Sequence, residues 1–210
     1  MREITLTQLT HWLQGKSNMI LFATGPTGSG KSTFVGNLGA KYAYKVAFPG
    51  KAVRSRPDLL TKVANSDNPT AAPELEQFVR NYVRRKARQS EGRCLAVDGM
   101  PRTIEQVSFC IDLALDFEKT PVFAYLDVSK EERIRRLSLR GEKSDKVLMS
   151  KRLESDDIHL PKVLGRLAQA VFGGRFGYFF LINTGGVCEE RQIAPVEGQP
   201  YGSRGTGTSI

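Results

Sequence analysis

The sequence contains few of the residues that bind zinc or form disulfide bridges. Its three cysteines, Cys94, Cys110 and Cys188, are widely separated and include no C-x-x-C pair. An odd number of scattered cysteines favours reduced thiols in a cytoplasmic compartment over disulfides or zinc ligands. The two histidines, His11 and His159, argue against a zinc site and against a histidine-based nucleophile.

Long apolar runs, internal repeats and long linkers are absent as well. No run approaches the roughly 20 apolar residues that a membrane-spanning helix needs, so no membrane span is expected. Residues 1–5 mix charges without a long apolar region, which argues against a secretory signal. A chain of 210 residues is long enough for one sizeable core with small insertions on it.

The net charge of +9 indicates a partner or ligand that carries negative charge. The densest basic run lies on a predicted helix and comprises Arg80, Arg84, Arg85, Lys86, Arg88 and Arg93. Such a run is either a nucleic-acid surface or the solvated face of a helix. A site that holds several phosphates accounts for excess basic charge without nucleic acid, so we expect no nucleic-acid partner.

Short apolar runs alternate with helical patterns along the chain. The predicted strands span 19–24, 46–48, 94–97, 122–126 and 178–182. The predicted helices include 6–14, 74–89, 103–117 and 130–139. This alternation predicts an α/β fold, a five-stranded parallel sheet with right-handed crossovers and helices on both faces. Ligands of such sheets bind outside the carboxyl ends of the strands, and each motif described below follows a strand end.

A glycine-rich segment after the first predicted strand matches the phosphate-binding pattern G-x-x-x-x-G-K-[ST]. It reads Gly25-Pro26-Thr27-Gly28-Ser29-Gly30-Lys31-Ser32 and runs into a helical pattern from Thr33. The glycines let backbone N–H groups converge on phosphate oxygens, and the helix N-terminus adds partial positive charge. Lys31 is expected to reach the β- and γ-phosphates, and the Ser32 hydroxyl to bind Mg²⁺. The segment therefore predicts a bound nucleoside triphosphate.

A second motif follows the strand predicted at 94–97. It reads Asp98-Gly99-Met100-Pro101-Arg102-Thr103, with Gln106 three residues further on. Asp98 ends the strand, where a carboxylate can order Mg²⁺ beside the phosphate-binding loop. Gly99 and Pro101 shape a turn from which Arg102 projects. An arginine at that point can bind a second phosphorylated ligand through a bidentate contact.

This motif resembles D-G-[FY]-P-R-T followed by a glutamine, the pattern of the adenylate kinase family of nucleoside monophosphate kinases. Met100 replaces the aromatic residue of that pattern. The resemblance implies that Gly99 and Arg102 contribute to binding an acceptor monophosphate and that Gln106 reads the adenine edge. It also implies a P-loop kinase fold, with ATP and Mg²⁺ as the donor complex.

Residues 48–54 are similar to the family segment S-T-G-D-x-[LM]-R, in which the arginine contacts the acceptor phosphate. Gly50 and Arg54 match this segment, whereas Pro49 and Lys51 replace its threonine and aspartate. The resemblance therefore implies that Gly50 and Arg54 belong to the acceptor site.

Residues 125–142 are similar to the segment that leads into the family's lid. The resemblance implies that Arg136 lies against the donor base and that Arg140 reaches the donor phosphates. In the lid itself, the family pattern of two arginines around an aspartate pair is met only with small insertions. The residues that fill it are Arg152, Asp156, Asp157 and Arg166, with Lys146 as a rival for the first position. Pro161 is expected to interrupt the helix that follows.

The resemblance implies one kinase domain over residues 1–194. Its expected insertions are an acceptor-binding segment at about 49–90 and a lid at about 140–160. Residues 195–210 are rich in Gly, Ser, Thr and Pro, a composition typical of a flexible tail. We expect the protein to act as a monomer.

The motifs together imply reversible transfer of the γ-phosphoryl group from Mg·ATP to a nucleoside monophosphate. AMP or dAMP is the expected acceptor because of Gln106. The predicted catalytic residues are Lys31, Arg102, Arg140, Arg152 and Arg166, which neutralise phosphate charge. No general base is expected, since the acceptor phosphate is already ionised, but a lid must exclude water.

Three alternatives stay open at this point. The first is a kinase of another monophosphate, because residues 48–54 depart from the family pattern. The second is a nucleic-acid-stimulated ATPase that uses the basic helix. The third is a nucleotide-binding module without turnover. The Asp98–Arg102 motif favours the kinase, since it serves an acceptor phosphate and has no evident use in a motor protein.

Overall fold

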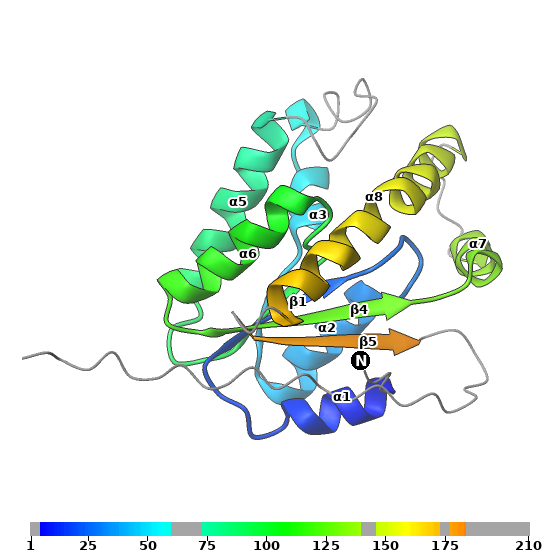
Figure 1. Ribbon diagram of the computed structural model, residues 1–210. Coiled ribbons are helices and arrows are strands. Elements are labelled where there is room, and N and C mark those ends of the chain that lie inside the picture. Colours follow the sequence, from blue (N-terminus) through cyan, green and yellow to red (C-terminus); the bar gives the residue numbers. More distant parts are fainter. Residues whose placement is uncertain (1–4, 60–72, 140–145, 173–176, 184–210) are drawn as a thin grey trace, which may run out of the picture.

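The computed structural model describes residues 5–59, 73–139, 146–172 and 177–183 (Figure 1). The elements in chain order are α1 (Leu6–Leu13), β1 (Met19–Thr24), α2 (Lys31–Tyr42), β2 (Lys45–Ala47), α3 (Pro49–Arg54), α5 (Pro73–Arg88), β3 (Leu95–Asp98), α6 (Ile104–Asp116), β4 (Thr120–Asp127), α7 (Lys130–Leu139), α8 (Lys146–Phe172) and β5 (Tyr178–Asn183). The predicted tail at 195–210 lies outside the described residues. No helix among the described residues is long and apolar enough to cross a membrane.

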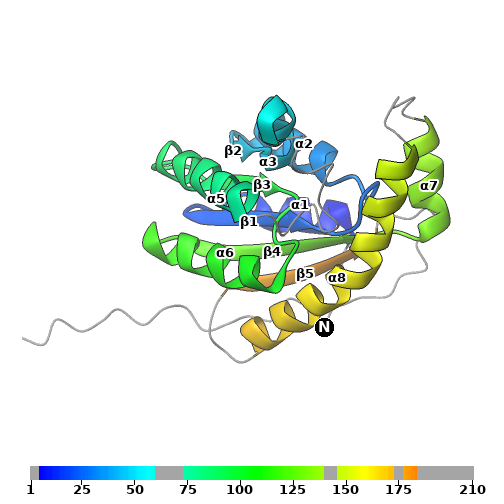
Figure 2. The same cartoon turned by 90° about the horizontal axis from the view of Figure 1, so that it is seen from above.

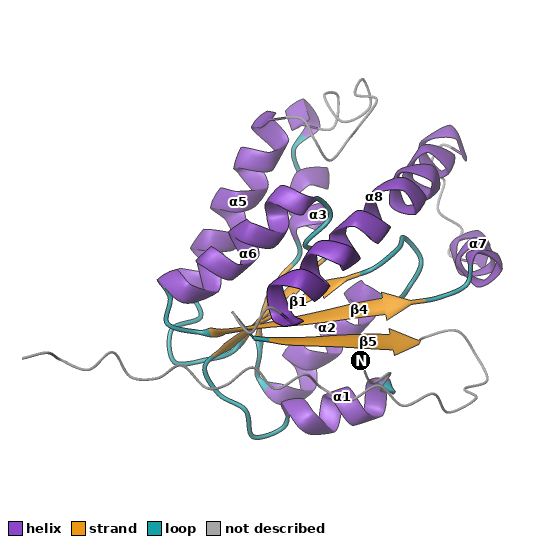
Figure 3. Ribbon diagram, in the orientation of Figure 1, coloured by secondary structure: helices purple, strands orange, loops and turns teal. Residues whose placement is uncertain are grey.

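The five strands form one parallel sheet in the order β2-β3-β1-β4-β5; Figure 3 shows the sheet in orange among the purple helices. β1 lies at the centre, with β3 and β4 on its two sides. Because all strands run in the same direction, their carboxyl ends meet at one edge of the sheet. The expected α/β architecture is confirmed, and the ends of the predicted strands differ from the observed ones by at most two residues.

Helices cover both faces of the sheet: in Figure 1, α5, α6 and α8 lie above the strands and α1 and α2 below them, and Figure 2 shows the strands side by side from above. Alternate residues of β1 point to opposite faces: Ile20 and Phe22 pack in a cluster with α5, α6 and α8, whereas Leu21 packs with α1 and α2. Each fully buried side chain of this size contributes roughly 1.5–3 kcal/mol. The continuous apolar run in β1 is therefore explained by burial on both faces.

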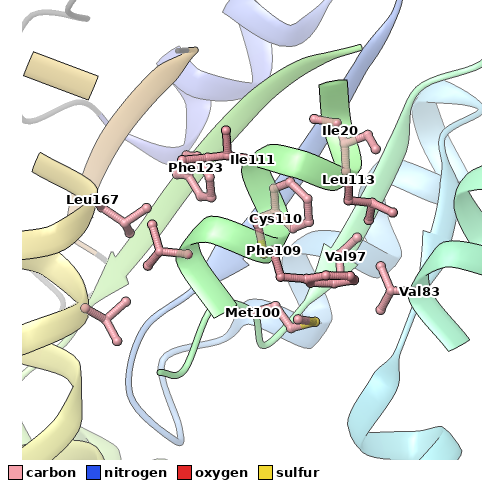
Figure 4. Packing of buried hydrophobic residues seen from close by; sticks show 14 of the residues in the cluster. Ile20, Val83, Val97, Met100, Phe109, Cys110, Ile111, Leu113, Phe123 and Leu167 are labelled. Atoms are coloured by element: carbon pink, nitrogen blue, oxygen red, sulfur yellow. The ribbon is translucent and has the colours of Figure 1, made fainter. Parts of the chain in front are cut away.

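Met100 belongs to the core and anchors the turn that carries Arg102. Its side chain is 2% exposed and packs in one cluster with Val97, Val83 and Phe109 (Figure 4). Methionine is unbranched and adapts to irregular gaps between larger side chains. The replacement of the family's aromatic residue therefore leaves an apolar packing position apolar.

A small satellite core joins α3 to α5, in the segment predicted to bind the acceptor. Val53 of α3 and Leu75 of α5 pack against one another with Leu59, apart from the two main clusters. This contact fixes the helix that carries Arg54 relative to the helix that carries Glu76. The two helices lie beside each other on one side of the sheet (Figure 1).

The expectation that Pro161 interrupts a helix is wrong. α8 is continuous from Lys146 to Phe172, with Pro161 inside it. An interior proline costs a helix about 3 kcal/mol through a lost hydrogen bond and a steric clash. Pro161 itself is exposed, while the neighbouring Leu160, Val163 and Leu167 are buried against the sheet and α6. Their burial outweighs the local cost.

Candidate active site

The phosphate-binding loop connects β1 to α2 at the carboxyl edge of the sheet, where the motif predicts it. Gly25 has φ of 132°, and a Cβ there would collide with the carbonyl oxygen of Leu126. Gly28 has φ of 89°, and a Cβ would lie 3.2 Å from Cα of Arg133. Both positions therefore require glycine: β4 leaves no room for a Cβ at Gly25, and α7 leaves little room for one at Gly28.

Lys31 opens α2 and is buried within the loop. Its Nζ donates to the carbonyl oxygen of Pro26 at 2.6 Å and to Oγ of Ser29 at 3.2 Å. The pKa of Lys31 is lowered to about 7, chiefly because burial disfavours the charged form and also because of the positive charge of Arg102. The carboxylates of Asp156 and Asp98 act in the opposite direction. The ammonium group is thus poorly solvated here, and an incoming anion would stabilise its charge.

The two predicted metal-binding residues lie together. Ser32 Oγ donates to Asp98 Oδ2 at 2.6 Å, so the hydroxyl of α2 meets the carboxylate that ends β3. The other oxygen, Asp98 Oδ1, is buried and has no hydrogen-bond partner among the described residues. A hard cation such as Mg²⁺ takes oxygen ligands and completes its shell with water and phosphate. The donor set therefore fits Mg²⁺.

The turn after β3 is fastened to β1, which also carries the phosphate-binding loop. Gly99 N donates to the carbonyl oxygen of Ala23 at 2.8 Å, and Thr24 Oγ1 donates to that of Pro101 at 2.5 Å. Thr103 then caps α6 by accepting a hydrogen bond from the N–H of Gln106. The backbone of the arginine motif is thereby held beside the loop.

Asp156 of α8 joins the loop to Arg102. Its Oδ2 accepts from the N–H of Thr27 at 2.6 Å, and its Oδ1 pairs with Nη1 of Arg102 at 3.4 Å. The carboxylate is 5% exposed and the Arg102 side chain 30% exposed. An acidic group in α8 therefore occupies a loop amide and neutralises the arginine expected to bind the acceptor.

Arg133 of α7 is a site residue that the motifs do not identify. Its Nε donates to the carbonyl oxygen of Thr27 at 3.3 Å, and its Nη1 pairs with Asp157 of α8 at 2.8 Å. The third nitrogen, Nη2, is buried without a hydrogen-bond partner among the described residues. The available signal is helical spacing, since Arg133 shares one helix face with the buried Leu137 four residues later.

Three other predicted residues lie at this edge or near it. Arg136 pairs with Glu132 at 2.7 Å, and its Nη1 lies 4.0 Å from the position of a Cβ at Gly30 in the loop. The exposed Arg54 has its Nη1 3.5 Å from the corresponding position at Gly50, so these two residues, both predicted to bind the acceptor, adjoin.

The predicted lid residues are less well defined. Arg166 is exposed on α8, and among the described residues it makes no contact with the phosphate-binding loop. Arg140 lies outside the described residues. Lys146 and Arg152 lie in the amino-terminal part of α8. Their assignments remain predictions.

The comparisons with known proteins agree with this geometry. Residues 24–151 match the family model described as an AAA domain. The chain is 30% identical over 129 residues to the adenylate kinase of Prochlorococcus marinus subsp. pastoris, which covers 60% of this chain and 70% of that protein. It is 28% identical over 156 residues to adenylate kinase isoenzyme 1 of Gallus gallus, over 67% of this chain and 76% of that protein. The chain therefore belongs to the adenylate kinase-like family of P-loop kinases.

Proposed function

We propose that the protein transfers the γ-phosphoryl group of Mg·ATP reversibly to a nucleoside monophosphate, with AMP or dAMP as the preferred acceptor. The observation that supports this most directly is the link from the N–H of Thr27 through Asp156 to Arg102. This link holds Arg102, which is suited to bind the acceptor phosphate, beside the loop that is suited to bind the phosphates of ATP.

The roles of the residues follow from the charge that phosphoryl transfer develops. Attacking and leaving oxygens must be held in line while the transferring group is neutralised. In this proposal Lys31 and the loop amides bind the donor phosphates, and Arg102 and Arg54 bind the acceptor phosphate. Asp98 and Ser32 would hold Mg²⁺, which supplies charge neutralisation and orients phosphate oxygens. Arg136 and Arg140 would bind the donor nucleotide. Arg152 and Arg166, which fill the lid pattern, would neutralise charge on the phosphates.

One experiment tests the proposal. The purified protein is incubated with Mg·ATP and, in turn, AMP, dAMP, GMP, CMP, UMP or dTMP, and the diphosphate products are separated and measured. With AMP as acceptor, we expect ATP and AMP to be converted into two molecules of ADP. In the reverse direction, we expect two molecules of ADP to give ATP and AMP. Hydrolysis of ATP without phosphorylation of any acceptor would contradict the proposal and, if stimulated by nucleic acid, would favour an ATPase.

A second candidate is a kinase of another nucleoside monophosphate. Pro49 and Lys51 stand where the family pattern has threonine and aspartate, and the Nζ of Lys51 lies over the ring of Phe48, 4.4 Å from its centroid. A cation at this point changes the set of hydrogen-bond donors available to a base. A clear preference for a pyrimidine or guanine acceptor in the same assay would identify this alternative.

The proposal extends to the setting of the enzyme. We expect a cytoplasmic monomer, because the predicted substrates are soluble nucleotides and the expected lid closes within one chain. Sedimentation of the purified protein with and without nucleotide would test the oligomeric state.

A further inference from the structure

The side-chain amide of Gln106 is held at both ends. Its Oε1 accepts from the backbone N–H of Arg102 at 2.7 Å, and its Nε2 donates to Glu76 Oε2 at 2.6 Å. The residue is 5% exposed. Glu76 lies on α5, 30 positions earlier in the chain, so only the packing of α5 near α6 creates this contact.

The two partners allow one orientation of the amide. A backbone N–H can only donate, and an ionised carboxylate can only accept. A flipped amide would place NH₂ against the N–H of Arg102 and oxygen against the carboxylate of Glu76. Both hydrogen bonds would be lost and like-signed atoms brought together in a buried place, which is costly.

Glu76 is itself fixed in position. Its Oε1 accepts from Nε of Arg80 at 2.6 Å, one helical turn further along α5. The guanidinium of Arg80 lies over the ring of the buried Phe109, 4.9 Å from its centroid. The chain of contacts from Phe109 through Arg80 to Glu76 therefore gives the carboxylate a defined place before any ligand binds.

The fixed amide keeps one donor and one acceptor for a ligand. A primary amide has two N–H groups and two oxygen lone pairs, and one of each is used here. The base edge of adenine offers a 6-amino donor and an N1 acceptor, which match what remains. A 6-oxopurine offers an oxygen acceptor and an N1–H donor, which face the amide with reversed polarity.

We propose that Glu76 determines base specificity as a positioning residue, by fixing the amide of Gln106 so that the acceptor site takes a 6-aminopurine monophosphate and rejects a 6-oxopurine one. This inference rests on the proposed function, since it assumes an acceptor nucleotide whose base reaches Gln106. Glu76 touches no substrate in this account and acts through Gln106 alone.

The test compares AMP with inosine monophosphate, two nucleotides that differ only at the base edge in question. The kcat/KM for each is measured with Mg·ATP for the unaltered protein and for Glu76→Gln, whose uncharged amide can pair with either orientation of Gln106. We expect the ratio of AMP to inosine monophosphate to fall about tenfold, the equivalent of one buried hydrogen bond. The affinity for ATP should not change.

Two further variants keep the test decisive. Glu105→Gln removes the same charge from an exposed position next to Gln106 and should leave the ratio unchanged. Arg80→Gln removes the group that holds Glu76 and should lower the ratio by a smaller factor, which matters if Glu76→Gln fails to fold. Binding of AMP and of inosine monophosphate is measured by calorimetry in parallel, so that the comparison does not depend on turnover.

The outcomes separate this inference from the proposed function. Equal losses for both nucleotides in Glu76→Gln, with a lower melting temperature, would show that Glu76 only supports packing and would overturn the inference. Equal use of both nucleotides by the unaltered protein would also overturn it, while the kinase assignment would stand. Failure to phosphorylate any monophosphate would contradict the proposed function. In that case the ratio of the affinities for AMP and inosine monophosphate would still show whether the amide of Gln106 distinguishes the two bases.

Discussion

The proposed donor side and the proposed acceptor side of the site are built in different ways. The donor side is one continuous segment, from Gly25 to Ser32, whose glycines and helix N-terminus create the phosphate-binding geometry locally. The proposed acceptor side is assembled from α3, α5 and the turn before α6, with Asp156 of α8 contacting Arg102 from 54 positions further along the chain. A contiguous motif is thus recognisable in the sequence, whereas an assembled one depends on packing.

The largest effect should come from the donor side. Lys31→Ala is expected to abolish phosphoryl transfer, because the phosphate charge loses its nearest cation. The fold should stay intact, since Lys31 donates only to atoms of its own loop among the residues that the structure describes. Rates are measured by coupled assay and folding by thermal denaturation. Near-normal turnover in a folded variant would show that this loop is not catalytic.

The next effect distinguishes the two sides. Arg102→Ala should cost about 3–5 kcal/mol of transition-state stabilisation, or roughly three orders of magnitude in rate. Arg54→Ala should raise the KM of the acceptor or lower kcat. ATP affinity, measured by calorimetry, should change little in either variant. If Arg102→Ala loses ATP affinity but keeps acceptor affinity, Arg102 belongs to the donor side.

Arg133 tests whether the link between the loop and α8 matters for stability. Arg133→Met removes the bonds to Thr27 and Asp157 but keeps an apolar stem of similar length. We expect a loss of about 1–3 kcal/mol in unfolding free energy, because the carbonyl of Thr27 loses its donor. Denaturant unfolding measures it. The exposed Arg135, which pairs with Glu132 of the same helix, provides the matched control Arg135→Met. Equal stability of the two variants would contradict a role for this link.

The smallest effect concerns pH. Because the pKa of Lys31 is lowered to about 7 in the protein alone, the amine is largely neutral above that pH and must gain a proton when phosphate binds. Affinity for ATP should therefore fall as pH rises, by about fivefold between pH 7 and pH 8. Calorimetry in buffers of different ionisation enthalpy should detect proton uptake. If ATP binding is independent of pH across this range and no proton is taken up, this prediction is wrong.

Much of the fold was predictable because hydrophobic periodicity is a local signal. The run at 19–24 and the helix at 130–139 coincide with β1 and α7. The path of α8 through Pro161 was not predictable in the same way, because the local cost of proline is visible in the sequence and the compensating burial is not. Arg133 was overlooked for a related reason. It stands among several arginines of one helix, and only packing distinguishes the buried one from the exposed ones.

The sequence by itself determined the phosphate-binding loop, the Asp98–Arg102 motif and the alternation of strands and helices, since each depends on neighbours within a few residues. Only the tertiary structure decided that Ser32 meets Asp98, that Asp156 reaches both Thr27 and Arg102, and that Glu76 fixes Gln106. These contacts join residues that are 30 to 129 positions apart. Their formation depends on which helices pack against which edge of the sheet, and that arrangement follows from burial of the whole core and not from any one segment.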